Sequence, residues 1–360
     1  MASEEIAFSP GRLAFRRLMR NPLGVVSMAY VLLVALMAIF AYALAPDHTP
    51  NANQMNLSLA LQPPGTTVAM FDLPPYHPEK NKLRAFFTGD PNAQYMAVDT
   101  AFEENGQWLY FEYGDEERII PKKIDLSEFE TTPKLREHSY LLGTDRFGRD
   151  LWSRVLIGSR ISITVGFIAV IISLLVGITL GSMAGYFGGK IDALIMWLVN
   201  VVWSIPTLLL VIAITLALGK GYWQVFLAVG LTMWVEVARV VRGEMMGLKE
   251  REFIEATKAL GFQHFRTIRK HLLPNLWSPV IVISSANFAA AILVESGLSF
   301  LGIGAQPPTP SWGSMIRDHY AYIIMDKAYL AMAPGFAIML LVLAFMLLGN
   351  ALRDALEVRN

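Results

Sequence analysis

The chain has 360 residues, of which 54% are hydrophobic and 17% are charged; its formal net charge is zero and it contains no cysteine. This composition is too apolar for an ordinary soluble domain and indicates a polytopic membrane protein. The lack of cysteine excludes disulfides and thiolate metal sites.

The N-terminal part predicts a membrane anchor. Residues 1–22 carry four arginines, and an apolar run, residues 23–46, follows them directly. At about 1.5 Å per residue, that run is long enough to cross a bilayer core of about 30 Å. A signal peptide would have a shorter apolar region. We therefore expect a retained first transmembrane helix at 23–46, with the arginines of 1–22 holding the N-terminus in the cytoplasm.

Residues 47–140 differ from the rest of the chain. They hold 15 acidic and 8 basic side chains, a net charge of −7, so the remaining residues have a net charge of +7. Apolar and polar residues alternate on both sides of Asn105-Gly106, which predicts a β-hairpin, and the prolines at 74, 75, 78, 91, 121 and 133 disfavour long helices. We expect a small β-rich extracytoplasmic insertion, because it follows the first span. It either contacts a substrate-binding protein or is a solvated decoration without a direct role.

The next segment, residues 141–160, reads LLGTDRFGRDLWSRVLIGSR. Asp145 with Arg149, and Asp150 with Arg154, have the i, i+4 spacing of ion pairs on a helix, and apolar side chains fall on the opposite face. This pattern predicts an amphipathic helix lying at the outer membrane surface.

Five further spans are predicted in residues 141–360. They cover residues 161–185, 192–218, 223–242, 276–301 and 329–350. Pro206 should break the second of these. Together with the first helix they make six spans, and basic residues cluster at both ends of the chain and in residues 250–275. That distribution places both termini and the 250–275 loop in the cytoplasm.

The loop at 250–275 has the pattern of two short amphipathic helices. Apolar residues recur at i, i+3 and i+7 in two runs: Phe253, Ala256, Leu260 and Phe265, Ile268, Leu272. Gly261 separates the runs and Pro274 ends the second. The apolar ridge needs to be covered, which indicates a partner protein. The alternative is a surface helix in the lipid headgroups, favoured by the basic residues of the loop.

The 250–275 loop resembles the coupling loop of ABC importer permeases. Glu255, Ala256, Gly261, Leu273 and Pro274 are in register with the motif of that family, with Thr257 in place of its second alanine. Residues 141–160 resemble the signature that precedes the second span in dipeptide, oligopeptide and nickel permeases. The resemblance covers about residues 10–46 and 141–360, and the chain looks like the second, C-type permease of a pair.

This resemblance implies an all-α polytopic membrane protein with six transmembrane helices and a cytoplasmic coupling-helix loop, to which the residue pattern at 47–140 adds the small β-rich extracytoplasmic insertion. It implies a permease of an ATP-driven importer, here for peptides, in the bacterial cytoplasmic (inner) membrane, multi-pass, with both termini cytoplasmic. The implied partners are a second homologous permease, two ATP-binding subunits that hold ATP and Mg, an extracytoplasmic substrate-binding protein and membrane lipid, without nucleic acid. The residues implied to contact the ATPases are Glu255, Ala256, Gly261, Phe265, Ile268, Leu273 and Pro274.

Polar side chains inside the spans are candidates for the transport path. An acid at mid-helix costs about 2.5–3.5 kcal/mol on insertion scales, so such groups should face protein or water. The candidates are Asn200, Ser204, Thr207, Glu236, Asn287 and Glu295. We predict that they line a path at the interface with the second permease. The alternative is that Glu236 and Arg239 neutralise each other and that Glu295 caps an outer helix end.

Motifs for chemistry are absent from the sequence. It contains no GxxxxGK[ST] phosphate loop, no HExxH and no paired histidine cluster. We therefore predict no enzyme activity, no metal site and no directly bound cofactor, with ATP hydrolysed by partner subunits. Three alternatives stay open: a proton-coupled secondary transporter that titrates Glu236, an ABC importer for nickel or another solute, and a non-transporting anchor for a sensing domain at 47–140.

Overall fold

The fold is taken from a computed structural model, which describes residues 10–73, 82–104, 107–115, 120–124 and 133–356. The chain divides into two compact units. We call Met1–Val34, Ser162–Gly304 and Ile338–Asn360 the helical unit, and Ala35–Ile161 with Ala305–Ala337 the sheet unit. The division falls within three helices, α2, α5 and α13.

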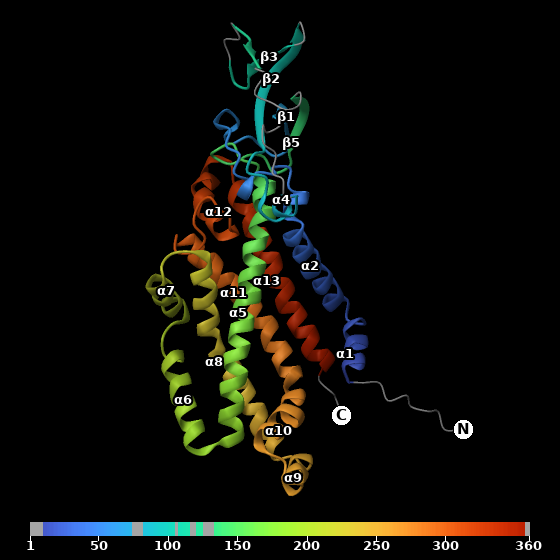
Figure 1. The fold of residues 1–360 in the computed structure, drawn as a ribbon, viewed down its shortest axis with the longest axis vertical. Helices are drawn as coiled ribbons and strands as arrows, with labels where there is room; N and C mark the ends of the chain where they lie inside the picture. The colour runs from blue at the N-terminus through green and yellow to red at the C-terminus, as the bar shows by residue number, and fades with distance from the viewer. Residues whose placement is uncertain (1–9, 74–81, 105–106, 116–119, 125–132, 357–360) are drawn as a thin grey trace, which may run out of the picture. The chain divides into compact units, whose positions relative to one another are not determined.

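Helices make up nearly all of the helical unit (Figure 1). The helices that lie wholly or partly in it are α1 Pro10–Leu18, α2 Pro22–Ile39, α5 Leu151–Phe187, α6 Gly189–Trp203, α7 Thr207–Leu218, α8 Tyr222–Lys249, α9 Glu252–Ala259, α10 His264–Thr267, α11 Trp277–Phe300 and α13 Tyr329–Leu356. A π-helical turn, Ile268–Leu272, and a 3-10 turn, Leu273–Leu276, join α10 to α11.

Five helical segments of the described chain are long and apolar enough to cross a membrane, and a sixth span results if α6 and α7 are counted together. These two helices are bent by 90° at the break that contains Pro206. Proline lacks the amide hydrogen that an uninterrupted helix would need there, as expected from the sequence. The predicted six spans are therefore matched only with the bent pair taken as one span.

Helix α8 lies at the centre of the helical unit, where it contacts α6, α7 and α11. Its contact with α5 depends on three glycines. A Cβ added at Gly177 would lie 2.5 Å from Cβ of Val237, and one at Gly181 would lie 2.5 Å from the carbonyl oxygen of Ala238. Gly185 has equally little room. These three glycines therefore allow α5 and α8 to pack closely against each other.

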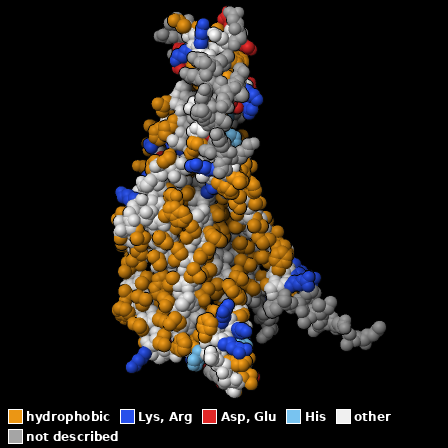
Figure 2. Space-filling model, viewed as in Figure 1, with side chains coloured by type: hydrophobic (Ala, Val, Ile, Leu, Met, Phe, Trp, Pro, Cys, Tyr) orange, Lys and Arg blue, Asp and Glu red, His pale blue; other side chains and the backbone are white. Residues whose placement is uncertain are grey.

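Apolar side chains also cover the outside of these helices. Figure 2 shows hydrophobic side chains over much of the visible face where the helices lie. Leu175 of α5 and Leu194 and Trp197 of α6 are each more than 60% exposed. Helices that are apolar both inside and outside are typical of a protein surrounded by lipid.

The sheet unit contains one five-stranded antiparallel sheet in the order β4-β3-β2-β1-β5. Its strands are β1 Thr66–Leu73, β2 Gln94–Glu104, β3 Gln107–Glu112, β4 Lys122–Lys123 and β5 Lys134–Tyr140. Its short helices are α3 Ala41–Leu44, α4 Lys82–Thr88 and α12 Trp312–His319, with 3-10 turns at Pro50–Ala52, Leu57–Leu59 and Tyr320–Met325. The expected β-rich insertion is thus a small sheet.

The predicted hairpin joins β2 to β3. These strands pair antiparallel with Glu104 opposite Gln107, and the turn at 105–106 lies outside the described residues. Phe71 of β1 is fully buried against Trp108 of β3, with ring centroids 5.2 Å apart. The alternation of apolar and polar residues therefore gives this sheet an apolar face of its own.

Candidate coupling loop and membrane path

The coupling loop begins at α9 and ends with the 3-10 turn Leu273–Leu276. Gly261 follows α9 with φ of +72°, the left-handed conformation expected at this helix end. The prediction of a second α-helix through Leu272 is wrong, because α10 ends at Thr267 and the chain widens into a π-helical turn. The ring of Pro274 would clash with the carbonyl four residues earlier, which accounts for the wider turn.

The loop is fastened to the rest of the helical unit by its buried residues. Ile254 and Leu272 are fully buried in one apolar cluster with Met245 of α8. The hydroxyl of Tyr186, at the end of α5, lies 2.9 Å from Nδ1 of His264. These contacts hold the loop to two long helices, α5 and α8.

Other apolar residues of the loop are exposed. Leu260 is 71% exposed and Phe265 is 70% exposed, while Phe253 is 41% exposed. In Figure 2, basic and hydrophobic side chains lie together at the end of the helices where Figure 1 places α9 and α10. Exposed apolar residues on a rigidly fastened loop are the pattern of a docking surface.

The seven residues expected to contact the ATPases divide into two groups. The exposed ones are Glu255, Ala256, Gly261, Phe265 and Pro274. Ile268 and Leu273 are half-buried and pack against the apolar cluster that fastens the loop. The contact role of all seven stays a prediction, and the first group offers the surface for it.

An ion pair that sequence reasoning missed joins α6 to α8. Nε and Nη2 of Arg242 donate to the two carboxylate oxygens of Asp192 at 2.5 Å and 2.6 Å. A bidentate guanidinium–carboxylate pair is among the strongest hydrogen-bonded contacts in proteins. The residues are 50 positions apart, so no local spacing indicates the contact.

The six candidate path residues do not form one cluster within this chain. Asn200, Ser204, Thr207 and Glu236 are exposed on α6, α7 and α8. Asn287 and Glu295 of α11 are each only 1% exposed. Their role in transport therefore stays a prediction.

The two buried residues have different surroundings. Glu295 accepts a hydrogen bond of 2.6 Å from the hydroxyl of Ser299. The amide nitrogen of Asn287 makes no hydrogen bond within the described part of the chain. A buried polar atom without a hydrogen-bond partner is energetically costly, and this distinguishes Asn287 from Glu295.

Glu236 and Arg239 are not paired in this structure. The guanidinium of Arg239 lies 3.6 Å from the centre of the Trp203 ring. Among the residues that the structure describes, no ion pair joins Arg239 to Glu236. The alternative in which the two neutralise each other directly is therefore not seen.

A cavity of about 470 Å³ lies among α8, α11 and α13. Its walls are largely apolar, with Glu244 of α8 and Arg353 of α13 among the lining residues. Neither residue was predicted from the sequence. Val240 and Glu244 are four residues apart and therefore lie on the same face of α8. Within the described ranges, no three His, Asp or Glu side chains gather as a metal site would require.

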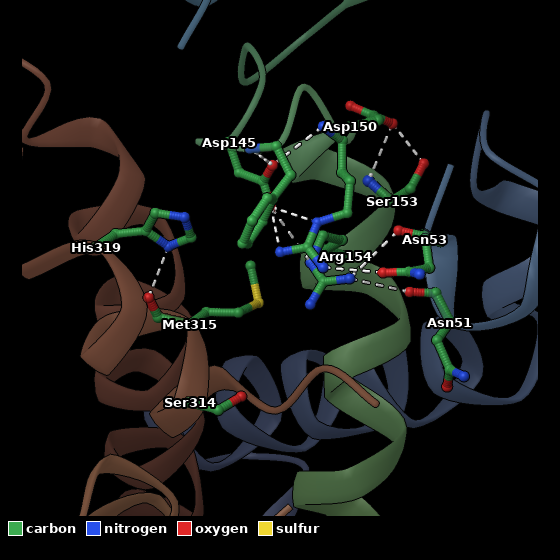
Figure 3. Close-up of polar contacts among 12 residues, drawn as sticks. Asn51, Asn53, Asp145, Asp150, Ser153, Arg154, Ser314, Met315 and His319 are labelled. Atoms are coloured by element: carbon green, nitrogen blue, oxygen red, sulfur yellow. Dashed lines mark hydrogen bonds and ion pairs between the residues drawn. The ribbon is translucent and has the colours of Figure 1, made fainter. Parts of the chain in front are cut away.

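The segment 141–154 of the sheet unit is folded differently from the prediction. It is helical only from Leu151, and Asp150 precedes the helix as an N-cap that accepts hydrogen bonds from the backbone and the hydroxyl of Ser153 (Figure 3). The predicted pair of Asp150 with Arg154 is therefore wrong. Burial raises the pKa of the Asp150 carboxyl, against the lowering effect of those hydrogen bonds.

Arg154 lies near Asp145 and not, as predicted, in an ion pair with Asp150. Asp145 forms the expected ion pair with Arg149 at 2.7 Å, and Nε of Arg154 lies 3.8 Å from the same carboxylate (Figure 3). All three side chains are buried in the sheet unit. The spacing at 145–149 thus identified a real pair, although the backbone there is a turn and not a helix.

Comparison with known proteins identifies the family. The family model described as binding-protein-dependent transport system inner membrane component matches residues 177–360. The model of the N-terminal TM domain of oligopeptide transport permease C matches residues 9–64. The chain belongs to this family of inner membrane permeases. Neither model covers residues 65–176, which include the whole sheet.

Three curated relatives resemble the permease over most of their length. The dipeptide transport system permease protein DppC of Alkalihalophilus pseudofirmus is 42% identical over 66% of this chain and 80% of its own. The glutathione transport system permease protein GsiD of Pectobacterium atrosepticum is 39% identical over 61% of this chain and 72% of its own. The oligopeptide transport system permease protein OppC of Bacillus subtilis is 36% identical over 62% and 73%.

The family match covers the coupling loop and every helix from α6 to α13. The permease is accordingly a multi-pass inner membrane subunit of a binding-protein-dependent transport system, as the motifs at 141–160 and 250–275 indicated.

Proposed function

We propose that this permease is the C-type membrane subunit of an ATP-driven importer of peptides. The three relatives are named for dipeptide, glutathione and oligopeptide transport, and all three cargoes are peptides. The permease forms half of a translocation path together with a second, homologous permease. The exposed polar residues Asn200, Ser204, Thr207 and Glu236 meet that partner, and Asn287 and Glu295 lie behind them.

The observation that carries this proposal is the coupling loop. Leu260 and Phe265 are about 70% exposed, while Ile254 and Leu272 fasten the loop to the long helices. A loop that is packed against the long helices and apolar on its outside can bind a partner, and a conformational change of that partner can then move the helices. The partners that undergo this change are two ATP-binding subunits, which hold ATP and Mg.

The orientation follows from the same assignment. Both termini and the coupling loop lie in the cytoplasm, and the sheet lies on the opposite side of the membrane, where a substrate-binding protein delivers cargo. The strands of the sheet give that protein a folded surface, and the net charge of −7 over residues 47–140 is available to complement a basic face.

Reconstitution tests the proposal. The permease, the second permease, the ATPases and the binding protein are placed in proteoliposomes, and uptake of labelled trialanine is measured with ATP or with a proton gradient. We expect uptake with ATP and none with the gradient alone. Uptake that responds to the gradient and ignores ATP would establish the proton-coupled alternative, and uptake of Ni²⁺ without peptide would establish the nickel alternative.

A further inference from the structure

A second cavity, in the sheet unit, has a wall rich in arginine. Its volume is about 220 Å³, smaller than the roughly 300–1,000 Å³ of pockets that enclose drug-sized ligands. Arg146, Arg149, Arg154 and Arg317 line it, and Asp318 is the one acid among its lining residues. A small, cationic cavity of this kind fits an anionic end group and not a whole oligopeptide.

The positive charges of this cavity exceed the negative charges placed to neutralise them. Asp318 pairs with Arg317 at 3.0 Å. Arg149 and Arg154 share the single carboxylate of Asp145. Two further buried acids lie nearby, and neither lines the cavity. Asp47 accepts hydrogen bonds from Thr49 and Gln54 on its own loop, and Asp150 accepts hydrogen bonds from Ser153 at the start of α5.

Arg146 adds a further positive charge to the cavity wall. Its guanidinium stacks over the ring of Phe147, 4.6 Å from the ring centre, and forms no ion pair within the described part of the chain. Counting Asp145 with the wall, four guanidinium groups face two carboxylates, so two positive charges are left without a matching acid.

Arg154 supplies a second, independent sign of a ligand. It is only 4% exposed, and its Nη1 donates to the carbonyl oxygens of Asn51 and Ala52, both at 3.3 Å. Its Nε is buried and has no hydrogen-bond partner among the described residues. Figure 3 shows Asn53, Arg154 and Ser314, three residues of the cavity wall, converging from three separate segments. A buried donor without an acceptor is costly, and a bound anion would satisfy it.

The rest of the wall is suited to the chain attached to such an anion. Met55, Phe147, Pro307 and Pro308 provide apolar surface beside the arginines. Guanidinium groups bind carboxylates in a two-pronged geometry, which lysine does not provide. A carboxylate is also the one anion that every unmodified peptide carries, whatever its sequence.

We propose that this cavity binds a carboxylate of the transported peptide, with Arg146 and Arg154 as its ligands. This inference rests on the proposed function as a peptide importer. It adds a point at which the permease itself, apart from the binding protein, selects cargo: a peptide that carries a free carboxylate is retained and a peptide without any carboxylate is not.

Direct binding to the purified full-length permease tests this site. The probes are trialanine with a free carboxylate, its C-terminal amide, and the C-terminal amide of Ala-Glu-Ala, each titrated by calorimetry without the binding protein. We expect the free acid to bind about tenfold more tightly than the trialanine amide, as one charge-assisted hydrogen-bonded contact provides. Tight binding of the Glu-containing amide would show that a side-chain carboxylate serves as well as the terminal one.

The variant Arg146→Gln decides the assignment, because this exposed side chain can change without disturbing the fold. We expect it to abolish most of the preference for the acid, and Arg154→Lys to weaken it by removing the fork while keeping the charge. Lys134→Gln, an exposed charge of the same unit outside the cavity, is the matched control and should keep the full preference. Equal affinities of acid and amide for the wild-type permease, or an unchanged preference in Arg146→Gln, would overturn the proposal.

ATP-driven uptake of trialanine, measured in parallel, separates this proposal from the broader one. If uptake fails while the preference for the acid and its loss in Arg146→Gln persist, peptide import is wrong and the carboxylate site stands. If uptake is driven by ATP and the preference is absent, the importer stands and the site is wrong.

Discussion

The segment 141–154 and the coupling loop have similar compositions but differ in which side chains they bury. Both mix charged and apolar residues next to a long apolar helix. In the first, Asp145, Arg149 and Arg154 are turned inward, and each is at most 5% exposed. In the second, Leu260 and Phe265 are turned outward and are about 70% exposed.

This difference separates charged groups held inside the chain from apolar groups left outside it. Burying charged groups is costly unless they are paired, and the sheet unit pairs them internally with Asp145. Leaving large apolar groups in water is unfavourable, and no described residue of the chain covers those of the loop. The first segment is therefore an internal support, and the exposed apolar groups of the second make it the candidate docking surface.

The largest effect is expected where the internal support is removed. Asp145→Ala leaves two buried guanidinium groups without their shared carboxylate and should lower the free energy of unfolding by about 3–5 kcal/mol. The matched control is Asp72→Ala, which breaks the exposed pair with Arg136 and should cost about 0.2–1 kcal/mol. Denaturant unfolding of the purified permease measures both. Equal losses in the two variants would remove the distinction between the segment and an ordinary surface.

A smaller effect is expected at the ion pair between α6 and α8, the second of which supports the loop. Asp192→Asn removes the charge that receives both hydrogen bonds of Arg242, which should cost about 1.5–3 kcal/mol. Arg242→Lys keeps the charge and loses the two-pronged geometry, so its loss should be smaller. The same unfolding measurement checks the order, and a greater loss in Arg242→Lys would contradict the bidentate assignment.

The next effect is at the turn of the loop. Gly261→Ala forces a side chain into the left-handed conformation and should cost about 1–2 kcal/mol, although an added Cβ meets nothing within 4 Å. Gly243→Ala, inside α8 and equally free of contacts, should stabilise the protein by about 0.5–1 kcal/mol. Opposite signs for these two glycines would show that backbone strain, and not space, requires glycine in the loop.

The smallest effect is a dependence on pH in the sheet unit. Burial lowers the pKa of His319, whose Nδ1 lies 2.8 Å from the carbonyl oxygen of Met315, so folding favours the neutral form of this ring. Between that lowered pKa and about 6.5 the unfolded chain binds the additional proton, so stability falls as pH falls, by at most about 1.4 kcal/mol per pH unit. Unfolding free energies from pH 5 to 7.5 should show a shallower slope in His319→Gln. An unchanged slope would contradict the assignment.

Local signals in the sequence predicted local features of the fold. Gly261 marked the left-handed turn, Pro206 marked the break between α6 and α7, and the alternation around residues 105–106 marked strands β2 and β3. Each of these follows from the conformational preference of one residue or one short pattern.

Contacts between distant residues could not be predicted in the same way. Asp192 and Arg242 are 50 positions apart, and the arginine cavity combines the segments near Asn53, Arg149 and Ser314. The start of α5 could have been found, because Asp150 three residues before Ser153 has the spacing of an N-cap. The i, i+4 spacing of Asp150 and Arg154 was the competing signal, and the cap prevailed because it satisfies backbone donors that are buried with it.

The central claim is that this permease is driven through its coupling loop, and ATPase binding tests it most directly. The affinity of the purified ATP-binding subunits for the permease is measured for the wild type, for Leu260→Glu with Phe265→Glu, and for Leu57→Glu, a control with equal exposure in the sheet unit. Interface anchors contribute about 2 kcal/mol or more each, so the loop variant should bind at least about a hundredfold more weakly, and the control should bind as the wild type does. Undiminished ATPase binding by the loop variant would contradict the account.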